Sequence, residues 1–254
     1  MYLGVDIGSL TTKVVLIAED KKIIDFKYQR TGSSGKDSAL KLIQEVLAKV
    51  GVTEEKVKGT VATGYGRVLF SGREYSEITC QARGVAHLFP GVRTIIDIGG
   101  QDSKVIAVGK NGKVLDFAMN DKCAAGTGRF LEVMSQALEV SLEEIGQLAE
   151  KSSEAARISS VCTVFAESEV VSNLSQGQSR EAVARGICEA VASRTAVLAQ
   201  KVGVVEPIVF TGGVAKNTGV VKALERKLGI SLVVPEDATI TAALGAALLA
   251  LENS

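Results

Sequence analysis

The spacing of apolar positions changes along this chain, and each change predicts a new element of secondary structure. A mainly apolar run covers positions 1–7 and a β-rich run covers 12–18, with only a short turn between them, and a third such run ends near Tyr28. Runs of this length, bounded by turn residues, are typical of strands. Residues 38–50 then place leucine, isoleucine and valine at helical spacing, with Gly51 as a C-cap. The first part of the chain is therefore predicted to be a strand meander followed by a helix.

The same order of elements begins again at residue 94. The tripeptide Asp-Ile-Gly, with a lysine five residues beyond its glycine, occurs within 6–13 and recurs within 97–104. A hairpin is expected at Asn111-Gly112, because this dipeptide is the strongest short signal for such a turn. Both halves thus begin as three strands and a helix, and we expect two lobes of one design.

The remaining pattern completes an α/β fold. Helices are expected at 77–89, 128–138, 141–150, 163–174, 180–202, 215–228 and 239–251. Further strands are expected at 57–63, 103–108, 113–119, 207–210 and 231–234, and a run typical of linkers occupies 31–36.

Composition narrows the class of partner. At 254 residues the chain can bury a large core, and 46% hydrophobic content with only 4% aromatic residues fits an α/β core of small aliphatic side chains. Basic and acidic side chains number 29 each. This balance indicates neither a nucleic-acid surface nor binding to acidic membranes. Any anionic ligand must therefore be held locally, by loops.

The beginning of the chain and its cysteines indicate a compartment. The chain opens on a strand-like run without a charged region or a long apolar segment, so we expect no signal peptide and no membrane span. We expect a cytoplasmic protein whose four cysteines are not a disulfide framework. Each cysteine is then a small buried hydrophobe or a ligand. The single His87 excludes a multi-histidine metal site within one subunit.

The two Asp-Ile-Gly turns predict a nucleotide site. A triphosphate needs backbone N–H donors from tight turns, and its Mg²⁺ needs carboxylates at the strand ends beside those turns. Asp6 and Asp97 would lie near the metal. Two ordinary hairpin turns are the alternative, and the matched second copy favours the nucleotide. The candidate donors are Gly8, Ser9, Thr11 and Thr12 on one side, and Gly99, Gly100 and Gln101 on the other.

A third glycine turn fits the same ligand. Thr211, Gly212 and Gly213 end a buried strand and open a helix, where a planar or anionic group can approach the backbone. A plain strand-to-helix turn is the alternative, but together with the other two turns the segment is consistent with an adenosine pocket. The chain has neither a P-loop nor a full Gly-x-Gly-x-x-Gly Rossmann turn, so those nucleotide folds are disfavoured.

The segment 120–130 combines small residues, two glycines and Cys123 ahead of a helical pattern. A helix N-terminus lowers the pKa of a thiol through its unpaired N–H groups and its dipole, so Cys123 is expected to be a metal-binding or redox-active thiolate. Redox sensing and nucleophilic catalysis would use the same feature. Cys162 also precedes a predicted helix, whereas Cys80 and Cys188 fall within helical patterns and are expected to be inert.

These turns, with Gly245-Ala246-Ala247 in the last predicted helix, resemble the actin, sugar-kinase and heat-shock-chaperone ATPase superfamily over essentially the whole chain. The resemblance implies two actin-like (ribonuclease H-like) α/β lobes that close on ATP in a cleft, with the last helix returning to the first lobe. We expect a first lobe of residues 1–92 plus 238–254, and a second of residues 93–237 that carries the two cysteines preceding helices.

Longer motifs narrow the resemblance. Residues 121–130 (DKCAAGTGRF) and 159–169 (SSVCTVFAESE) closely resemble the activator components of 2-hydroxyacyl-CoA dehydratases. Residues 97–102 (DIGGQD) and 211–217 (TGGVAKN) match that family too. These activators are of the BadF/BadG/BcrA/BcrD type and are related to benzoyl-CoA reductase ATPase subunits. The resemblance implies one-electron transfer driven by ATP hydrolysis to a 2-hydroxyacyl-CoA dehydratase, with reduced ferredoxin or flavodoxin as the donor.

The resemblance also implies one 4Fe–4S cluster that bridges a homodimer. Such a cluster is held by four thiolates, one chain offers Cys123 and Cys162 ahead of helices, and a two-fold axis doubles these two to four.

Roles in the nucleotide site follow from the same resemblance. Asp6 and Asp97 would position Mg²⁺, Lys13 would neutralise phosphate charge, and Gln101 would orient the attacking water. Further contacts to ATP or ADP are expected from Gly126, Gly128, Gly212, Gly213 and Lys216.

Other functions stay open on the sequence alone. The chain could be the ATPase subunit of a benzoyl-CoA-reductase-like enzyme, a cluster-free small-molecule kinase of the same superfamily, or a non-enzymatic nucleotide-dependent iron–sulfur sensor. Iron and sulfide content separates the kinase from the others, and hydrolysis coupled to no reduction favours the sensor.

Overall fold

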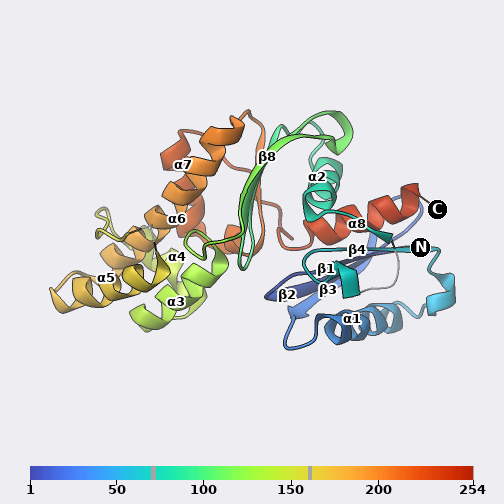
Figure 1. The fold of residues 1–254 in the computed structure, drawn as a ribbon, viewed down its shortest axis with the longest axis horizontal. Helices are drawn as coiled ribbons and strands as arrows, with labels where there is room; N and C mark the ends of the chain where they lie inside the picture. The colour runs from blue at the N-terminus through green and yellow to red at the C-terminus, as the bar shows by residue number, and fades with distance from the viewer. Residues whose placement is uncertain (70–72, 160–161, 254) are drawn as a thin grey trace. The chain divides into compact units, whose positions relative to one another are not determined.

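The computed structural model describes residues 1–69, 73–159 and 162–253, which form two units (Figure 1). The first unit contains Met1–Ile95, Val108–Asp116 and Glu236–Ser254, and the second contains Ile96–Ala107 and Phe117–Pro235. Both combine strands with helices, as the periodicity predicted.

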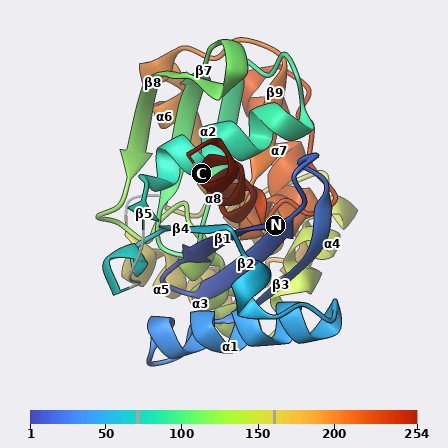
Figure 2. The ribbon, with the colours of Figure 1, turned by 90° about the vertical axis from the view of Figure 1, so that its right-hand side faces the viewer.

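Within the described residues the first unit is built on a five-stranded sheet with the order β3-β2-β1-β4-β5 (Figure 2). β2 is antiparallel to β1 and β3, so the predicted meander is confirmed. β4 runs parallel to both β1 and β5, and its end therefore lies beside the end of β1. The strands are β1 (Tyr2–Ile7), β2 (Thr11–Ile17), β3 (Ile23–Arg30), β4 (Gly59–Thr63) and β5 (Arg73–Glu74).

Helices cover both faces of this sheet (Figure 1). Leu3, Val5 and Ile7 pack with α1 (Gly35–Lys49) on one face. Tyr2 packs with α8 (Thr241–Glu252) on the other. Because successive strand side chains point to opposite faces, β1, whose residues are all buried, contributes to two cores at once.

α8 also crosses α2 (Glu77–Leu88) at very short range. A Cβ atom at Gly245 would lie 1.7 Å from the carbonyl oxygen of Cys80, and one at Gly84 would lie 1.9 Å from that of Thr241. Two helix backbones can approach this closely only where neither carries a side chain. The last helix, which consists mainly of alanine and leucine, therefore packs against α2 at a crossing that requires glycine in both helices.

The second sheet has the order β8-β7-β6-β9 (Figure 2). Its strands are β6 (Thr94–Ile98), β7 (Ser103–Val108), β8 (Val114–Asn120) and β9 (Ile208–Thr211). Between β7 and β8, Asn111 and Gly112 have φ values of 57° and 73°, and Lys113 N–H donates to the Lys110 carbonyl at 3.2 Å. These are features of a type I′ turn, so the predicted Asn-Gly hairpin is confirmed.

The strand expected at 231–234 is reduced to a single parallel bridge between Val209 and Val233. Val233 and Val234 are 41% and 37% exposed, so the run lies at a sheet margin, where only one side is covered. An apolar triplet alone could not distinguish this margin from a full strand.

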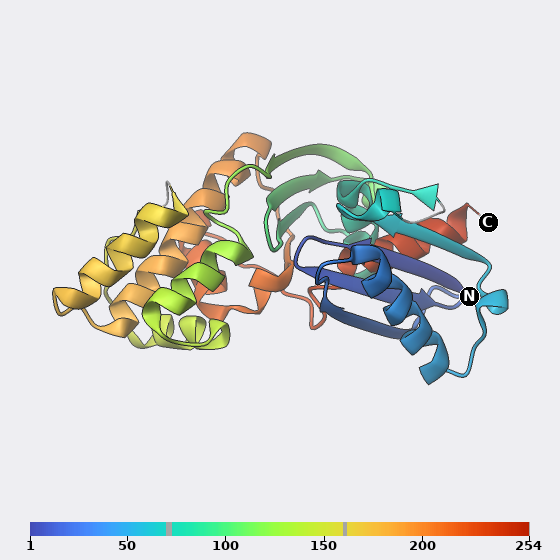
Figure 3. The ribbon, with the colours of Figure 1, turned by 60° about the horizontal axis from the view of Figure 1, so that its bottom comes forward.

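Helices α3 to α7 pack together in the second unit (Figure 3). α6 contacts all four others, and buried alanines along it allow those helices to approach. Among the described residues, no helix combines the length and apolarity needed to cross a bilayer. The helices are α3 (Gly128–Leu138), α4 (Leu142–Lys151), α5 (Thr163–Ser175), α6 (Arg180–Val202) and α7 (Thr218–Leu228), with short 3-10 turns at Glu54–Lys56, Arg67–Leu69, Lys110–Gly112 and Gly213–Lys216.

The run at 31–36, expected to be a linker, is instead part of the first unit's structure. Thr31 N–H donates to the Leu10 carbonyl at 3.0 Å. Ser34 is the N-cap of α1 and accepts from Asp37 N–H at 3.3 Å. Its polar composition reflects capping, which such residues do as readily as they form linkers.

Gly245→Ala should destabilise the protein strongly, because the new methyl group would overlap the backbone of α2. We expect the free energy of unfolding in urea to fall by about 3 kcal/mol or more. Gly229→Ala is the control. Gly229 ends α7 with φ 70° and has nothing within 4 Å of a Cβ, so backbone strain alone should cost about 1 kcal/mol. Equal losses in the two variants would contradict the close crossing.

Candidate functional site

The first Asp-Ile-Gly turn joins β1 to β2 in the first unit. Asp6 and Lys13 are partners in the strand register, and Lys13 Nζ lies 2.8 Å from Asp6 Oδ2. Gly8 N–H donates to the Thr11 carbonyl at 3.1 Å and closes the turn. Gly8, Ser9 and Thr11 all stay partly accessible. The turn therefore presents backbone and hydroxyl groups next to a carboxylate that one lysine partly neutralises.

The buried carboxylate of Asp6 is only partly satisfied by hydrogen bonds. Its side chain is 4% exposed, and among the described residues Oδ1 has no hydrogen-bond partner. Burying a carboxylate oxygen without a partner is unfavourable. A hard cation such as Mg²⁺, or a water molecule bound to it, would satisfy this oxygen. The environment of Asp6 therefore fits the metal-side role predicted for it.

Thr31, which no motif identified, follows β3 directly and forms hydrogen bonds to the same turn. Its hydroxyl donates to the Gly8 carbonyl at 2.7 Å and lies 3.0 Å from Thr12 Oγ1. Thr12 is fully buried, so the described contacts place it behind the turn. Its predicted contact with a nucleotide stays a prediction. Only the fold brings residues this far apart in sequence together, and no local spacing pointed to Thr31.

The second Asp-Ile-Gly turn, between β6 and β7, has the same closing hydrogen bond and the same Asp–Lys ion pair as the first. Gly99 N–H donates to the Asp102 carbonyl at 2.9 Å, as Gly8 does to Thr11. Lys104 Nζ lies 3.3 Å from Asp97 Oδ2, and also 3.0 Å from Asp102 Oδ2. The Lys104 side chain is only 1% exposed, against 14% for Lys13. In this half the lysine is enclosed between two carboxylates.

Asp97 also joins this turn to the third glycine turn. The Thr211 hydroxyl donates to Asp97 Oδ1 at 2.9 Å, and Thr211 is the last residue of β9 before Gly212 and Gly213. Two of the three predicted nucleotide turns are therefore held together inside the second unit. Gly213 and Lys216 are exposed on the 3-10 turn that follows. Gln101 is exposed in the second Asp-Ile-Gly turn, which we call the second phosphate turn after its predicted ligand.

Asp102 and Lys104 were absent from the predicted site, and Thr211 was predicted only as part of the third glycine turn, not as a partner of Asp97. The repeat was a usable signal for Lys104, because the constant offset makes it the counterpart of Lys13. The pairing of Thr211 with Asp97 joins residues far apart in sequence, and nothing local indicates it.

Cys123 lies in a loop that Asn120 organises. Asn120 Nδ2 donates to the carbonyls of Cys123 and Ala125 at 2.8 and 3.4 Å, and Cys123 N–H donates to Asn120 Oδ1 at 3.2 Å. The N-cap of α3 is Thr127, so the expectation that Cys123 sits at a helix N-terminus was wrong. The helical pattern was located correctly, but a turn of small residues separates it from the cysteine.

The start of α3 is bonded to the second phosphate turn. Gly128 N–H donates to the Gly99 carbonyl at 2.9 Å, and Arg129 N–H donates to the Gly100 carbonyl at 2.8 Å. Gly126, also predicted to contact the nucleotide, is buried, and a Cβ on it would lie 2.8 Å from the Cβ of Arg194. Both glycines thus have packing roles, and their predicted contacts with the nucleotide stay predictions.

The other cysteines fall into two kinds. Cys162 is half-buried and is the N-cap residue of α5, a helix that packs against α3. Cys80 and Cys188 are buried within α2 and α6, where desolvation raises the pKa of each thiol to about 12. These two thiols stay protonated at neutral pH and are poor metal ligands. Their predicted inertness fits this burial.

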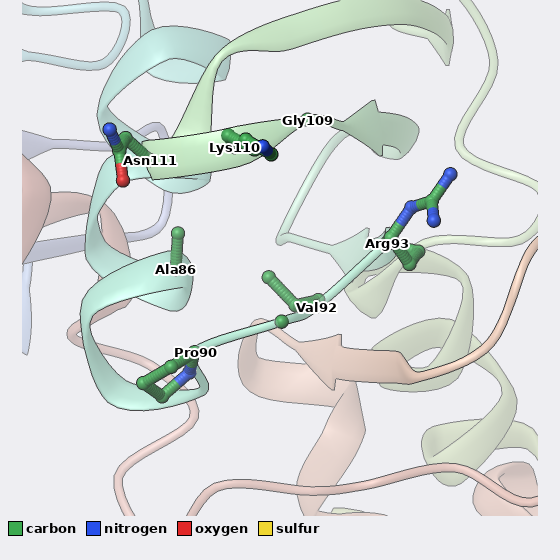
Figure 4. Close-up of a pocket in the computed structure, with 8 residues that line it drawn as sticks. Ala86, Pro90, Val92, Arg93, Gly109, Lys110 and Asn111 are labelled. Carbon is green, nitrogen blue, oxygen red and sulfur yellow. The ribbon is translucent and has the colours of Figure 1, made fainter.

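The described residues contain no group of three or more cysteine, histidine or acidic side chains placed to hold a metal ion. One chain therefore presents Cys123 and Cys162 as a pair of accessible thiols rather than as a complete site. A pocket of about 520 Å³ elsewhere in the first unit is lined by none of the predicted site residues (Figure 4). Its lining residues are Ala86, Pro90, Gly91, Val92, Arg93, Gly109, Lys110 and Asn111.

The two sheets and their paired turns define an actin-like ATPase with two α/β lobes, so the predicted fold class is confirmed. The chain belongs to the BadF/BadG/BcrA/BcrD ATPase family, whose model matches residues 3–250. The resemblance drawn from 121–130 and 159–169 is confirmed by the relatives described next.

One relative is the activator of lactoyl-CoA dehydratase from Anaerotignum propionicum, 49% identical over 99% of this chain and 98% of the relative. Among solved structures, the activator of the 2-hydroxyisocaproyl-CoA dehydratase from Clostridium difficile with bound ADPNP is 43% identical. It covers 100% of this chain and 95% of its own, with a TM-score of 0.94. The Acidaminococcus fermentans (R)-2-hydroxyglutaryl-CoA dehydratase component A is 45% identical, with a TM-score of 0.95 and coverage of 99% and 98%.

Lys104→Met should be strongly destabilising, because it leaves the carboxylates of Asp97 and Asp102 buried without their cation. We expect the free energy of unfolding to fall by about 3–5 kcal/mol in urea. Lys13→Met is the matched control from the other half of the repeat. Lys13 is more exposed and contacts one carboxylate rather than two, so its loss should cost less, about 2 kcal/mol. Losses of similar size would show that the two lysines are equivalent and would refute this account.

Proposed function

We propose that this chain is an ATP-dependent activator of a 2-hydroxyacyl-CoA dehydratase that delivers one electron at a time to its partner. Relatives that match it over at least 99% of its length are named as activators of 2-hydroxyacyl-CoA dehydratases. The observation that carries the proposal is the hydrogen-bonded connection of the second phosphate turn to the loop of Cys123. It links the element expected to bind nucleotide to an element expected to bind metal.

ATP is proposed to bind to the two Asp-Ile-Gly turns, one from each of the lobes predicted at 1–92 plus 238–254 and at 93–237. In the solved activator with ADPNP, a nucleotide analogue is bound to a chain 43% identical to this one. The N–H groups of the two phosphate turns donate to phosphate oxygens, and Lys13 neutralises part of their charge. The turn at 212–213 and Lys216 contact the adenosine side. Gln101, exposed in the second turn, orients the water that attacks the γ-phosphate.

Mg²⁺ would be held on the side of Asp6, whose Oδ1 has no hydrogen-bond partner among the described residues. Bound there, it would neutralise charge on the β- and γ-phosphates. Asp97 plays a different part, because Lys104 and Thr211 hold both of its oxygens. It fixes the second turn and positions it for the phosphates.

The donor set of one chain fits half of a 4Fe–4S site. Cys123 and Cys162 are half-buried, whereas Cys80 and Cys188 are fully buried and protonated. A cluster of this type needs four thiolates, so two chains related by a two-fold axis would complete it. Once bound, the cluster supplies a site that accepts and releases one electron at low potential. The chain is proposed to work as this homodimer.

ATP drives the transfer only if it binds the competent arrangement of the chain more tightly than the resting one. We propose that nucleotide binding changes the second phosphate turn, and with it the loop that carries Cys123. A reduced ferredoxin or flavodoxin donates the electron, and hydrolysis makes delivery to the dehydratase effectively irreversible. A cluster-free kinase of the same fold would have no use for the two accessible thiols.

The test is anaerobic purification followed by iron and sulfide assay. The wild-type chain should contain iron and sulfide near four of each per dimer, as one 4Fe–4S cluster requires, and it should be coloured. The double variant Cys123→Ser and Cys162→Ser should lose both. The matched control, Cys80→Ala with Cys188→Ala, removes the same number of thiols from buried positions and should retain the iron. A wild-type chain without iron would favour the kinase, and full iron in the first variant would refute the ligand assignment.

A further inference from the structure

The first N–H groups of α3 donate to carbonyls of a turn that lies well before the helix in the sequence. The first N–H groups of a helix have no acceptor within the helix and need one elsewhere. Thr127, the N-cap residue, makes no side-chain bond to the helix and instead donates its hydroxyl to the Ala124 carbonyl at 2.6 Å. The acceptors for Gly128 and Arg129 are the Gly99 and Gly100 carbonyls of the second phosphate turn.

The contact between turn and helix is also close in space. A Cβ on Gly128 would lie 3.1 Å from the Gly99 carbonyl oxygen and 3.3 Å from the Cα of Gly100. These distances are tighter than most real Cβ contacts, so a methyl group there would require the two backbones to shift by a few tenths of an ångström. Two hydrogen bonds and a tight backbone contact therefore make the turn and the start of α3 one rigid piece.

The loop between Asn120 and α3 is itself closed, so it moves with that piece. The Asn120 side chain bonds to Cys123 in both directions, through Nδ2 and Oδ1. Thr127 N–H donates to the Ala124 carbonyl at 3.0 Å and closes the end next to the helix. Cys123 lies in the loop between the hydrogen bonds of Asn120 and that of Thr127.

We propose that Gly128 and the Arg129 N–H are positioning groups that transmit a change at the second phosphate turn to the loop of Cys123. The inference rests on the proposed function in one respect, namely that a nucleotide binds against residues 99–101. It adds the route of transmission. A change at Gly99 and Gly100 passes across two backbone hydrogen bonds to α3, and from α3 to the closed loop at 120–127. This role requires no contact of either group with the nucleotide or a metal.

Arg129→Pro and Arg129→Ala form a matched pair that isolates one of the hydrogen bonds. Both remove the side chain and its ion pair with Glu132, but only proline also removes the N–H that donates to Gly100. Proline is tolerated in the first turn of a helix, so the variant is expected to fold. Gly128→Ala is the second, independent variant, since it keeps both N–H groups and separates the backbones.

The measurement is hydrogen exchange by mass spectrometry on the full chain, purified anaerobically, with and without Mg²⁺ and ADPNP. In the wild type and in Arg129→Ala, ADPNP should slow exchange both in peptides covering 97–104 and in peptides covering 120–130. In Arg129→Pro and Gly128→Ala the change at 97–104 should persist, while the change at 120–130 is lost.

Two results overturn the inference: a wild type that responds at 97–104 alone, and an Arg129→Pro variant that responds like wild type in both segments. No response at 97–104 in the wild type contradicts the nucleotide site and the inference together. A chain that responds in both segments, yet contains no iron and activates no dehydratase, refutes the proposed function and supports the transmission path.

Discussion

The carboxylate of Asp97 is the charge on which the second unit depends. It lies at the end of β6, nearly out of reach of water, and each of its oxygens has a partner. Lys104 supplies the positive charge, and Thr211 supplies a hydroxyl from β9. A buried carboxylate is tolerable only when it is paired and hydrogen-bonded in this way. The arrangement joins the second Asp-Ile-Gly turn to the glycine turn that follows β9.

The eight-residue pattern at 6–13 and 97–104 has a different environment in each half of the chain. Each half has the Asp–Lys pair and the closing glycine N–H, so the duplication extends to individual bonds. In the first half Asp6 keeps an unpartnered oxygen, and Lys13 remains partly accessible. In the second half Asp102 and Thr211 add further partners, and Lys104 is enclosed. One half is thus suited to a metal and phosphate, and the other to holding a rigid turn.

Much of this could be predicted from the sequence because it depends on local rules. Periodicity located the strands and helices to within a few residues, and Asn111-Gly112 identified a hairpin, because side-chain direction and turn geometry act over short distances. The repeated Asp-Ile-Gly likewise located two turns that are closed by matching hydrogen bonds. The helix after Cys123 was located correctly at 128–138, but Thr127 is its N-cap, and a turn of small residues separates that N-cap from the cysteine.

The rest depended on contacts between residues distant in sequence. Nothing near Thr31 or Thr211 shows that their hydroxyls meet Gly8 and Asp97. Gly128 was interpreted as a ligand contact, whereas the structure shows its backbone against that of Gly99. A glycine in a motif signals that something approaches closely, and only the fold identifies what approaches.

The central claim is that nucleotide binding reaches the metal held by Cys123. The most direct measurement is electron paramagnetic resonance of the dithionite-reduced protein, prepared anaerobically, with and without MgATP. The account predicts that MgATP changes the g-values or the line shape of the iron–sulfur signal, because the loop that holds the metal moves with the second phosphate turn. A spectrum that is unchanged at saturating MgATP, in a preparation that hydrolyses ATP, would contradict it.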